Sequence, residues 1–190
     1  MASKEYYNRE FAAKDFLNGI TAHTTFEACT FDGLLLPNTI FEQIDFIDCS
    51  FINCDFSTSQ WPGSGIKNCS FEGCKLIGID FTVCQPFLFH FSAQECNLSF
   101  AQFSKCNMEN FTFTNCEMQE VDFGHAKLKK AQFSACKLTG SLFEHTNLEE
   151  ADFRTAREFA IHPEKNKLKG ARFLATNLEG LLAHLPIHVE

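Results

Sequence analysis

The chain has 190 residues, 45% of them apolar, which is enough for one domain with a buried core. Its 24 acidic and 16 basic residues give a net charge of −8, which disfavours direct contact with the phosphates of nucleic acid. No apolar run approaches the about 20 residues of a membrane helix, and the polar start is unlike a signal peptide. These features predict a cytoplasmic protein that contacts no membrane.

A large apolar residue recurs at every fifth position near the start of the chain. Phe11 and Phe16 are already in this register, and the residue two places before each centre is usually small. From residue 26 the centres continue without a slip at Phe26, Phe31, Leu36, Phe41, Phe46, Phe51 and Phe56. Such an internal repeat has to be interpreted before any helix or motif is assigned.

A period of five fits neither regular secondary structure. In an α-helix, residues i and i+5 lie about 140° apart around the axis, and an unbroken strand has a period of two. The pattern instead predicts a chain that is extended for three residues and then turns a corner. The centre and the residue two before it point inward, and the residue between them points outward. Repetition of this unit winds the chain into a prism lined by apolar side chains.

The pattern fades from Ser57 to Gly65, yet Phe71 resumes it 15 residues after Phe56. The number of units is therefore preserved, and the stretch is predicted to occupy a coil while bulging as a loop. The register places Trp61 at a centre. It either fills the core or projects as an aromatic contact for a partner.

A change of frame follows, because Phe91 and Leu98 are seven residues apart where five are expected. Two residues are therefore inserted near 91–98. Phe87 and Leu88 are expected at a corner, either exposed as contacts for a partner or packed beneath a short loop. The stretch 85–97 is a second place where a functional loop could project.

From Cys96 to Phe153 phenylalanine alternates strictly with leucine or methionine at the centres. An even number of sides stacks phenylalanine on phenylalanine, whereas three sides would stack it on leucine. Four sides make a coil of 20 residues, and Cys96, Cys116 and Cys136 are spaced accordingly. The sequence therefore predicts a four-sided coil.

The repeat is interrupted at 157–166, where Glu158 and Pro163 occupy centre positions and neither suits the interior. The chain is expected to leave the wall there and to return at Leu168. A short helix from Leu178 to Leu185, followed by an extended end, would cover the open core. We divide the chain into a solenoid at 1–180 and a cap or dimerisation segment at 181–190. The apolar residues of that segment are Leu181, Leu182, Leu185, Ile187 and Val189.

The units resemble the pentapeptide repeat proteins, whose pattern is a small residue, Asp or Asn, Leu or Phe, and two variable residues. Matching units include Cys54-Asp55-Phe56, Cys96-Asn97-Leu98 and Ala151-Asp152-Phe153. The resemblance implies an all-β fold, a right-handed quadrilateral parallel β-helix. The stretch from Ile161 to Asn166, with Leu181 and Leu182, is similar to the ending of the quinolone-resistance and microcin-immunity members. In the family such an end pairs two rods, which implies a homodimer.

No residue pattern indicates catalysis, a cofactor or a metal. All ten cysteines occupy the small position two before a centre, where a free thiol packs well, as expected in a reducing compartment. The seven histidines are scattered, and Pro186 disrupts the helical spacing of His184 and His188. We expect a protein that is not an enzyme.

Charge is distributed unevenly along the chain. From Asp15 to Ala126 there are 14 acidic and three basic residues, a net charge of −11, whereas Lys127 to Glu190 has ten basic and eight acidic residues. A DNA duplex of about 27 Å, the predicted length of this shaft, would carry about 16 charges. The candidate contacts with a partner are outward carboxylates, namely Asp32, Asp45, Asp55, Asp80 and Asp122.

Two functions are compatible with an acidic rod. The resemblance implies a DNA mimic that binds a type II topoisomerase such as DNA gyrase and protects it from quinolones or similar toxins. The alternative is a structural or protein-interaction scaffold with another partner. A continuous negative stripe on one face would favour mimicry, and mixed charge would favour the scaffold.

Overall fold

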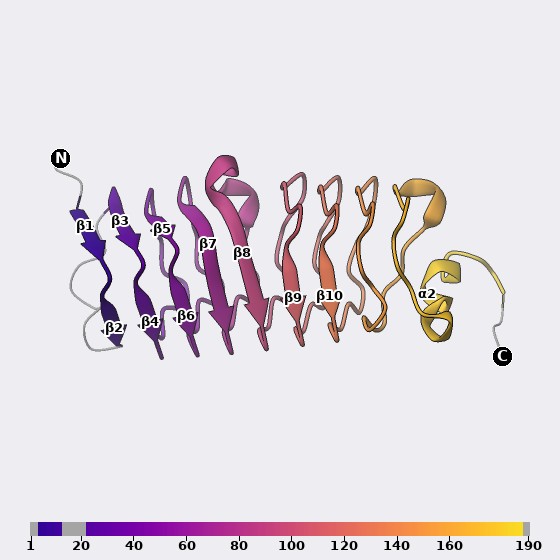
Figure 1. Ribbon diagram of the computed structural model, residues 1–190, viewed down its shortest axis with the longest axis horizontal. Coiled ribbons are helices and arrows are strands. Elements are labelled where there is room, and N and C mark those ends of the chain that lie inside the picture. Colours follow the sequence, from indigo (N-terminus) through magenta and orange to yellow (C-terminus); the bar gives the residue numbers. More distant parts are fainter. Residues whose placement is uncertain (1–3, 13–21, 188–190) are drawn as a thin grey trace.

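The computed structural model describes residues 4–12 and 22–187, which wind along one axis into a rod with the two ends of the chain far apart (Figure 1). All strand pairs are parallel, and most join residues 20 apart, such as Phe31 with Phe51. The fold is the predicted right-handed four-sided β-helix. Two residues named in the sequence analysis, Phe16 and Val189, lie outside the described residues. The strands are β1 (Lys4–Tyr7), β2 (Glu10–Ala12), β3 (Thr24–Glu27), β4 (Thr30–Asp32), β5 (Asp45–Ile47), β6 (Ser50–Ile52), β7 (Gly65–Glu72), β8 (Phe89–Gln94), β9 (Thr112–Thr114) and β10 (Gln132–Ser134).

Most strands have only three or four residues because each side of the coil is extended over about three residues before it turns. β7 and β8 are longer because they continue across a corner and join two sides of the rod. Short helical turns occur where the repeat is disturbed. They are η1 (Phe81–Val83), η2 (Pro86–Leu88), η3 (Pro163–Lys165), η4 (Ala175–Asn177) and α2 (Glu179–Leu182).

The four sides of the rod are here called walls 1 to 4, in chain order, and each is defined by its outward residues. Wall 1 contains Glu5, Thr25, Asp45, Gly65, Leu88, Asn107, Lys127, Asn147 and Lys167. Wall 2 contains Glu10, Thr30, Ser50, Ser70, Ser92, Thr112, Gln132, Asp152 and Arg172. Wall 3 contains Leu35, Asp55, Lys75, Asn97, Glu117, Lys137 and Arg157, and wall 4 contains Ile40, Gln60, Asp80, Gln102, Asp122 and Leu142. The unbroken ladder of wall 2 has nine rungs, which we use to number coils 1 to 9.

Centre residues form stacked columns inside the rod. Phe103, Phe123 and Phe143 are buried, and their ring centroids are 5.5 Å and 5.0 Å apart in nearly parallel pairs. Columns on adjacent walls meet edge to face, as in the pair Phe123 and Phe133 at 5.9 Å. Offset stacks and edge contacts are the favoured arrangements of aromatic rings. The predicted alignment of phenylalanine with phenylalanine in successive coils is confirmed.

Most corners turn through a residue with positive φ two places after the centre. Glycine occupies some of these positions, but Lys105 (φ 63°) and His125 (φ 58°) adopt the same backbone conformation. This region costs about 1–2 kcal/mol for a residue with a Cβ atom. The regular hydrogen bonds between coils maintain it: the Lys105 N–H donates to Gly124 O at 2.9 Å, and the His125 N–H donates to Glu144 O at 2.7 Å.

Where the small residue two places before a centre carries a hydroxyl or thiol, its side chain can link two coils. Ser141 Oγ donates to Met118 O at 2.6 Å and accepts from Val121 N at 3.2 Å. Cysteine thiols act likewise, since Cys74 Sγ donates to Phe51 O at 3.4 Å and accepts from Cys54 N at 3.3 Å. All ten cysteines are free thiols. A small side chain with one polar hydrogen therefore satisfies backbone groups that the turn would leave unpaired.

The stretch from Ser57 to Gly65 does not bulge, contrary to the prediction. Thr58 N donates to Ile77 O at 2.7 Å, and Gln60 pairs with Ile40 as in an ordinary coil. Trp61 is only 1% exposed, and its ring lies 4.3 Å from that of Phe41. Its indole N–H donates to the buried Ser59 Oγ at 2.8 Å. This internal acceptor allows tryptophan to fill a centre, so the prediction of Trp61 as a projecting contact is wrong.

The frame changes earlier than the predicted position near 91–98. Gln85 still follows the regular spacing, because its N–H donates to Ser64 O, but Ile66 already pairs with Phe89, 23 residues later. The inserted residues are therefore those of η2, and a bulge after Lys67 reduces the offset to 22. Ala93 takes the centre, and Phe91 takes the small position opposite Cys69. The exchange of a large and a small residue maintains the packed volume.

The regular repeat is interrupted at 157–166, where η3 lies. Glu158 turns outward with φ 56° and forms an ion pair with Lys137 at 3.6 Å, while Phe159 and Ile161 enter the core in its place. The helix α2 is shorter than the predicted 178–185. Among the cap residues, Leu181 and Leu182 are half-buried, and Leu185 and Ile187 are exposed.

Candidate protein-binding surface

The inserted turn η2 is a local projection from an otherwise smooth rod. Figure 1 shows the chain between β7 and β8 rising above the neighbouring coils. Gln85 anchors it: its side-chain Nε2 donates to Gly63 O at 2.8 Å and to Asp45 Oδ1 at 3.1 Å. Pro86 begins the turn, where its fixed φ suits a helical start. The turn is therefore tied to the coil beneath it on one side.

Phe87 and Leu88 have different environments within η2. Leu88 is half-buried and packs over Gly65, where an added Cβ would approach the Leu88 side chain to 2.9 Å. Phe87 is 81% exposed and is the most exposed large apolar side chain among the described residues. A ring held in solvent by an anchored turn is typical of a contact residue. Phe87, with Leu88 beneath it, remains a candidate contact with a partner.

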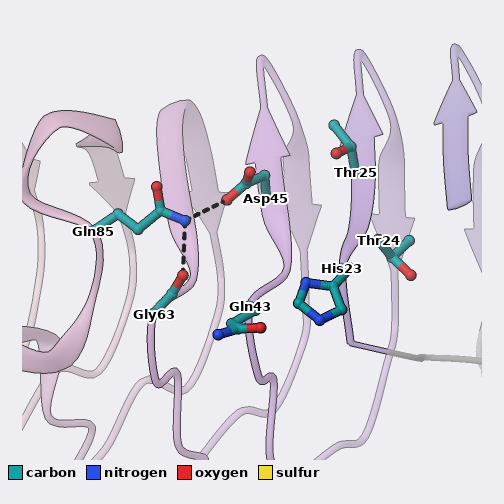
Figure 2. Close-up of a pocket in the computed structure, with 7 residues that line it drawn as sticks. All are labelled: His23, Thr24, Thr25, Gln43, Asp45, Gly63 and Gln85. Atoms are coloured by element: carbon teal, nitrogen blue, oxygen red, sulfur yellow. Dashed lines mark hydrogen bonds between the residues drawn. The ribbon is translucent and has the colours of Figure 1, made fainter. Parts of the chain in front are cut away.

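A shallow groove of about 390 Å³ lies on wall 1 beside this turn. Figure 2 shows Gln85 extending toward Asp45 and Gly63, with Gln43 and His23 on the neighbouring coils. The remaining lining residues are Thr24 and Thr25. Carboxylate, amide and hydroxyl groups dominate the lining. The groove can therefore accept a positively charged or hydrogen-bond-donating group, such as a lysine or arginine side chain.

The coils around this groove are the most acidic part of the rod. Residues 22–66 contain six carboxylates and no lysine or arginine. Four of the six, Glu27, Glu42, Asp45 and Asp48, lie on wall 1 or at its two edges. The next basic residue is Lys67, and wall 1 becomes basic from Lys127 onward. The negative charge therefore forms a patch on the N-terminal coils and not a stripe along the rod.

The five candidate aspartates do not gather in one place. Asp32 follows the wall 2 centre, Asp45 lies on wall 1, Asp55 on wall 3, and Asp80 and Asp122 on wall 4. Only Asp45 lies near η2. The others are distributed around the rod, which does not produce the single stripe that would favour DNA mimicry.

Three of these aspartates also stabilise corners. In each of them, Oδ1 accepts a hydrogen bond from the backbone N–H two residues later. The donors are Ser57 for Asp55 at 3.0 Å, Thr82 for Asp80 at 2.9 Å, and Gly124 for Asp122 at 2.7 Å. Partial burial raises the pKa of Asp55, but hydrogen bonds from Ser57 and Lys75 outweigh this effect and lower the pKa below its ordinary value. These side chains have a structural role in the repeat whether or not a partner binds.

No catalytic arrangement accompanies the groove. Within 4–12 and 22–187, no three His, Cys, Asp or Glu side chains are grouped to hold a metal ion. Burial raises the pKa of Cys106, the one half-buried thiol, to about 11, so it remains protonated near neutral pH. In the same ranges, no helix is both long and apolar enough to cross a membrane. The surface is suited to binding.

The groove residues His23, Gln43 and Gln85 were not anticipated from the sequence. A usable signal exists, because His23, Gln43 and Gly63 are 20 residues apart and must share one edge of the rod. Gln85 lies 40 residues after Asp45, which is two coils, so the same spacing places it on wall 1 beside them. The acidic patch itself can be found by the absence of basic residues from 22 to 66.

Comparison with known proteins supports the repeat architecture. The family model described as pentapeptide repeat region matches residues 89–157 and 108–182, and the model of the SV2A/B/C luminal domain matches residues 1–71. No curated protein matches the sequence.

Three solved structures with the same fold are 14–17% identical to this chain. A trypsin-treated variant of QnrB1, a plasmid-mediated fluoroquinolone resistance protein, is 16% identical with a TM-score of 0.63, covering 99% of this chain and 98% of that one. Full-length QnrB1 is 17% identical with a TM-score of 0.55, covering 97% and 98%. HetL, a pentapeptide repeat protein involved in heterocyst differentiation regulation from the cyanobacterium Nostoc sp. strain PCC 7120, is 14% identical with a TM-score of 0.66, covering 88% and 81%. The match to the pentapeptide repeat model, with the five-residue units and the 20-residue coil, shows that the chain belongs to the pentapeptide repeat family.

Proposed function

We propose that the protein is a non-enzymatic rod that binds another protein with a basic surface. The carrying observation is the acidic patch of residues 22–66, which has six carboxylates and no lysine or arginine. Four of the six lie on or beside wall 1, where the groove is bounded by η2. A rigid acidic surface attracts a basic partner over several ångströms and loses little conformational entropy on binding. Phe87 would add an apolar contact at the edge of the patch.

The specific partner that we propose is the DNA-binding cleft of a type II topoisomerase such as DNA gyrase, with protection from quinolones or similar toxins as the result. Two observations support it. The fold matches QnrB1, a fluoroquinolone resistance protein, over nearly its whole length, and the shaft from Asp15 to Ala126 carries a net charge of −11. Mimicry of DNA would be confined to the N-terminal coils, because wall 1 becomes basic beyond them.

A scaffold with a different partner is the second candidate. Wall 3 favours it, since its charges alternate and pair with each other, as Lys75 does with Asp55 at 3.3 Å. Exposed Leu35 and Ile40 add apolar surface near that wall. Contacts of this kind do not depend on long-range attraction, so a scaffold complex should persist at high salt.

Two further parts of the proposal concern the setting of the protein. Ten free thiols support a reducing cytoplasm, where such groups remain unpaired. The exposed Leu185 and Ile187 support pairing of two rods through the C-terminal end. Val189, the last apolar residue proposed for this contact, lies outside the described residues.

The test is a gyrase supercoiling assay with and without a fluoroquinolone. The protein should relieve fluoroquinolone inhibition or change supercoiling at micromolar concentration. The variant Glu27→Gln/Asp45→Asn/Asp48→Asn should need at least about tenfold more protein, because three like charges are removed from the patch. The matched control Glu144→Gln/Glu149→Gln/Glu164→Gln removes three charges from the C-terminal coils and should stay within about twofold.

No effect of the unmodified protein in this assay would rule out the topoisomerase. A partner captured from lysate equally well by the unmodified chain and by the patch variant, and retained at high salt, would support the scaffold. Equal activity of the patch variant and the control would contradict binding through the acidic patch.

A further inference from the structure

Wall 1 has opposite charge at its two ends. Its outward residues in coils 1 and 3 are Glu5 and Asp45, whereas those in coils 7 and 9 are Lys127 and Lys167. At the edge that wall 1 shares with wall 2, Asp48 in coil 3 and Lys130 in coil 7 have the same polarity as the wall, whereas Lys67 in coil 4 and Glu109 in coil 6 have the reverse. The turn η2 lies in coil 5, the middle of the nine. The outward residues of wall 1 are therefore negatively charged in the N-terminal half of the rod and positively charged in the C-terminal half, with η2 between the two halves.

We propose that two copies of this chain pair side by side and antiparallel through wall 1. The two-fold axis would lie in the plane of the interface, perpendicular to the long axes of both rods, at the level of coil 5. Such an axis places each coil n opposite coil 10 − n of the second copy and leaves each edge of the wall facing the same edge. The contact is distinct from pairing through the C-terminal ends.

This symmetry brings opposite charges together at four places in each half of the interface. Asp45 faces Lys127, and Glu5 faces Lys167, along the middle of the wall. At the edge shared with wall 2, the first facing pair is Lys67 with Glu109, and the second is Asp48 with Lys130. All of these side chains are exposed except Asp45, which is half-buried.

Most of these charges lack a partner within the rod. Among the described residues, Lys67, Lys127 and Lys167 form no ion pair, whereas Lys130 pairs with Glu150 at 3.7 Å. One facing pair is repulsive, Glu27 with Glu149, although Lys129 lies 4.0 Å from Glu149 and offsets it. The favourable contacts therefore outnumber the unfavourable one.

Competing arrangements are less favourable. Parallel rods would place Asp45 on Asp45 and Lys127 on Lys127, and like charges in contact are costly. Wall 3 also carries both signs, but three of its charged residues already form ion pairs within the rod, in Lys75 with Asp55 and Lys137 with Glu158. At the axis of the proposed pair, the two copies of Phe87 would meet at the same edge and supply an apolar centre.

The test uses Lys67 and Glu109, two exposed residues at equivalent positions on coils 4 and 6. Sedimentation velocity at low and high salt should show a dimer of the 21.5 kDa chain that dissociates as salt rises. Lys67→Glu places two acidic groups in contact, and Glu109→Lys places two basic ones, so each variant alone should lose at least about tenfold in affinity. An equimolar mixture of the two variants should dimerise, because both contacts between positions 67 and 109 again join opposite charges.

Two control variants separate this contact from others. Glu117→Lys changes a wall 3 charge and should leave the dimer intact. Leu185→Ser/Ile187→Ser removes apolar side chains from the C-terminal end and should also leave it intact. A chain that remains monomeric at low salt would overturn the proposal. A dimer that Lys67→Glu does not weaken, or single variants whose mixture fails to associate, would overturn it as well.

Discussion

Replacing Trp61 with alanine should lower the free energy of unfolding by about 3–5 kcal/mol, the usual cost of removing a large buried aromatic side chain. The ring is 1% exposed and contacts the columns of Phe41, Phe46 and Phe56, with centroid distances of 4.3 to 5.5 Å. Neighbouring coils cannot close the space, because the hydrogen bonds between coils fix their separation. Urea unfolding followed by circular dichroism measures the effect.

Two variants control for this prediction. Trp61→Phe retains the stack and should recover most of the stability. Phe87→Ala removes an aromatic ring that is 81% exposed and should change stability by less than about 0.5 kcal/mol. Trp61 is the only tryptophan, so its fluorescence should also resist quenching by iodide. A loss below about 1 kcal/mol in Trp61→Ala, or ready quenching, would show that the indole is not in the core.

Replacing Gly180 with valine should detach the C-terminal cap from the last coil. Gly180 is the buried residue of α2, and a Cβ atom there would lie 2.4 Å from both the ring and the carbonyl oxygen of Phe159. Because one of these atoms belongs to the backbone, the side chain cannot simply rotate away, and the helix must move. The Ile161 N–H, which donates to Gly180 O at 2.9 Å, would lose its partner.

Amide hydrogen exchange tests this directly. Protection of the Ile161 amide should fall at least about a hundredfold, equivalent to about 2.7 kcal/mol, while the Phe123 amide, in the middle of the rod, should keep its protection. Ala183→Val places the same side chain at an exposed position next to α2 and should change neither amide. Unchanged exchange at Ile161 in Gly180→Val would contradict the cap contact.

The architecture could be predicted from the sequence because its determinant is local. A large side chain every fifth residue can be buried only if the chain turns at the same interval, and the alternation of Phe103 and Met108 indicates an even number of sides. The conformation of the corners could not be predicted in this way. Lys105 and His125 have no intrinsic preference for positive φ. The hydrogen bonds with adjacent coils impose this backbone conformation on them.

The irregular segments show where residue type alone is insufficient. Phe91 has the size of a centre and was assigned as one, but Ala93 occupies that position because η2 shifts the frame. Glu158 and Pro163 signal a departure from the wall, yet nothing in the sequence marks Phe159 as a residue that enters the core in place of Glu158. In both cases the packed volume was conserved while the position of each side chain changed.

The candidate surface was partly predictable. Outward carboxylates follow from their position before a centre, and the register alone separates Asp45 from Asp55, because ten residues are half a coil and place them on opposite walls. The groove depends on Gln85 reaching Asp45 over 40 residues of sequence. Forty residues are two coils, so the spacing places Gln85 on wall 1, but it does not reveal that the Gln85 side chain reaches back to Asp45.

Zero-length carbodiimide cross-linking with mass spectrometry tests the four-sided coil most directly. The reagent joins only a lysine and a carboxylate in contact. The structure predicts amide bonds between residues 20 or 21 apart, namely Lys75 with Asp55, Lys130 with Glu150 and Lys165 with Glu144, whose charged atoms are 3.3, 3.7 and 3.0 Å apart. Cross-links between Lys105 and Glu109, as in a helix, or between Lys105 and Glu120, as in a three-sided coil, would contradict it.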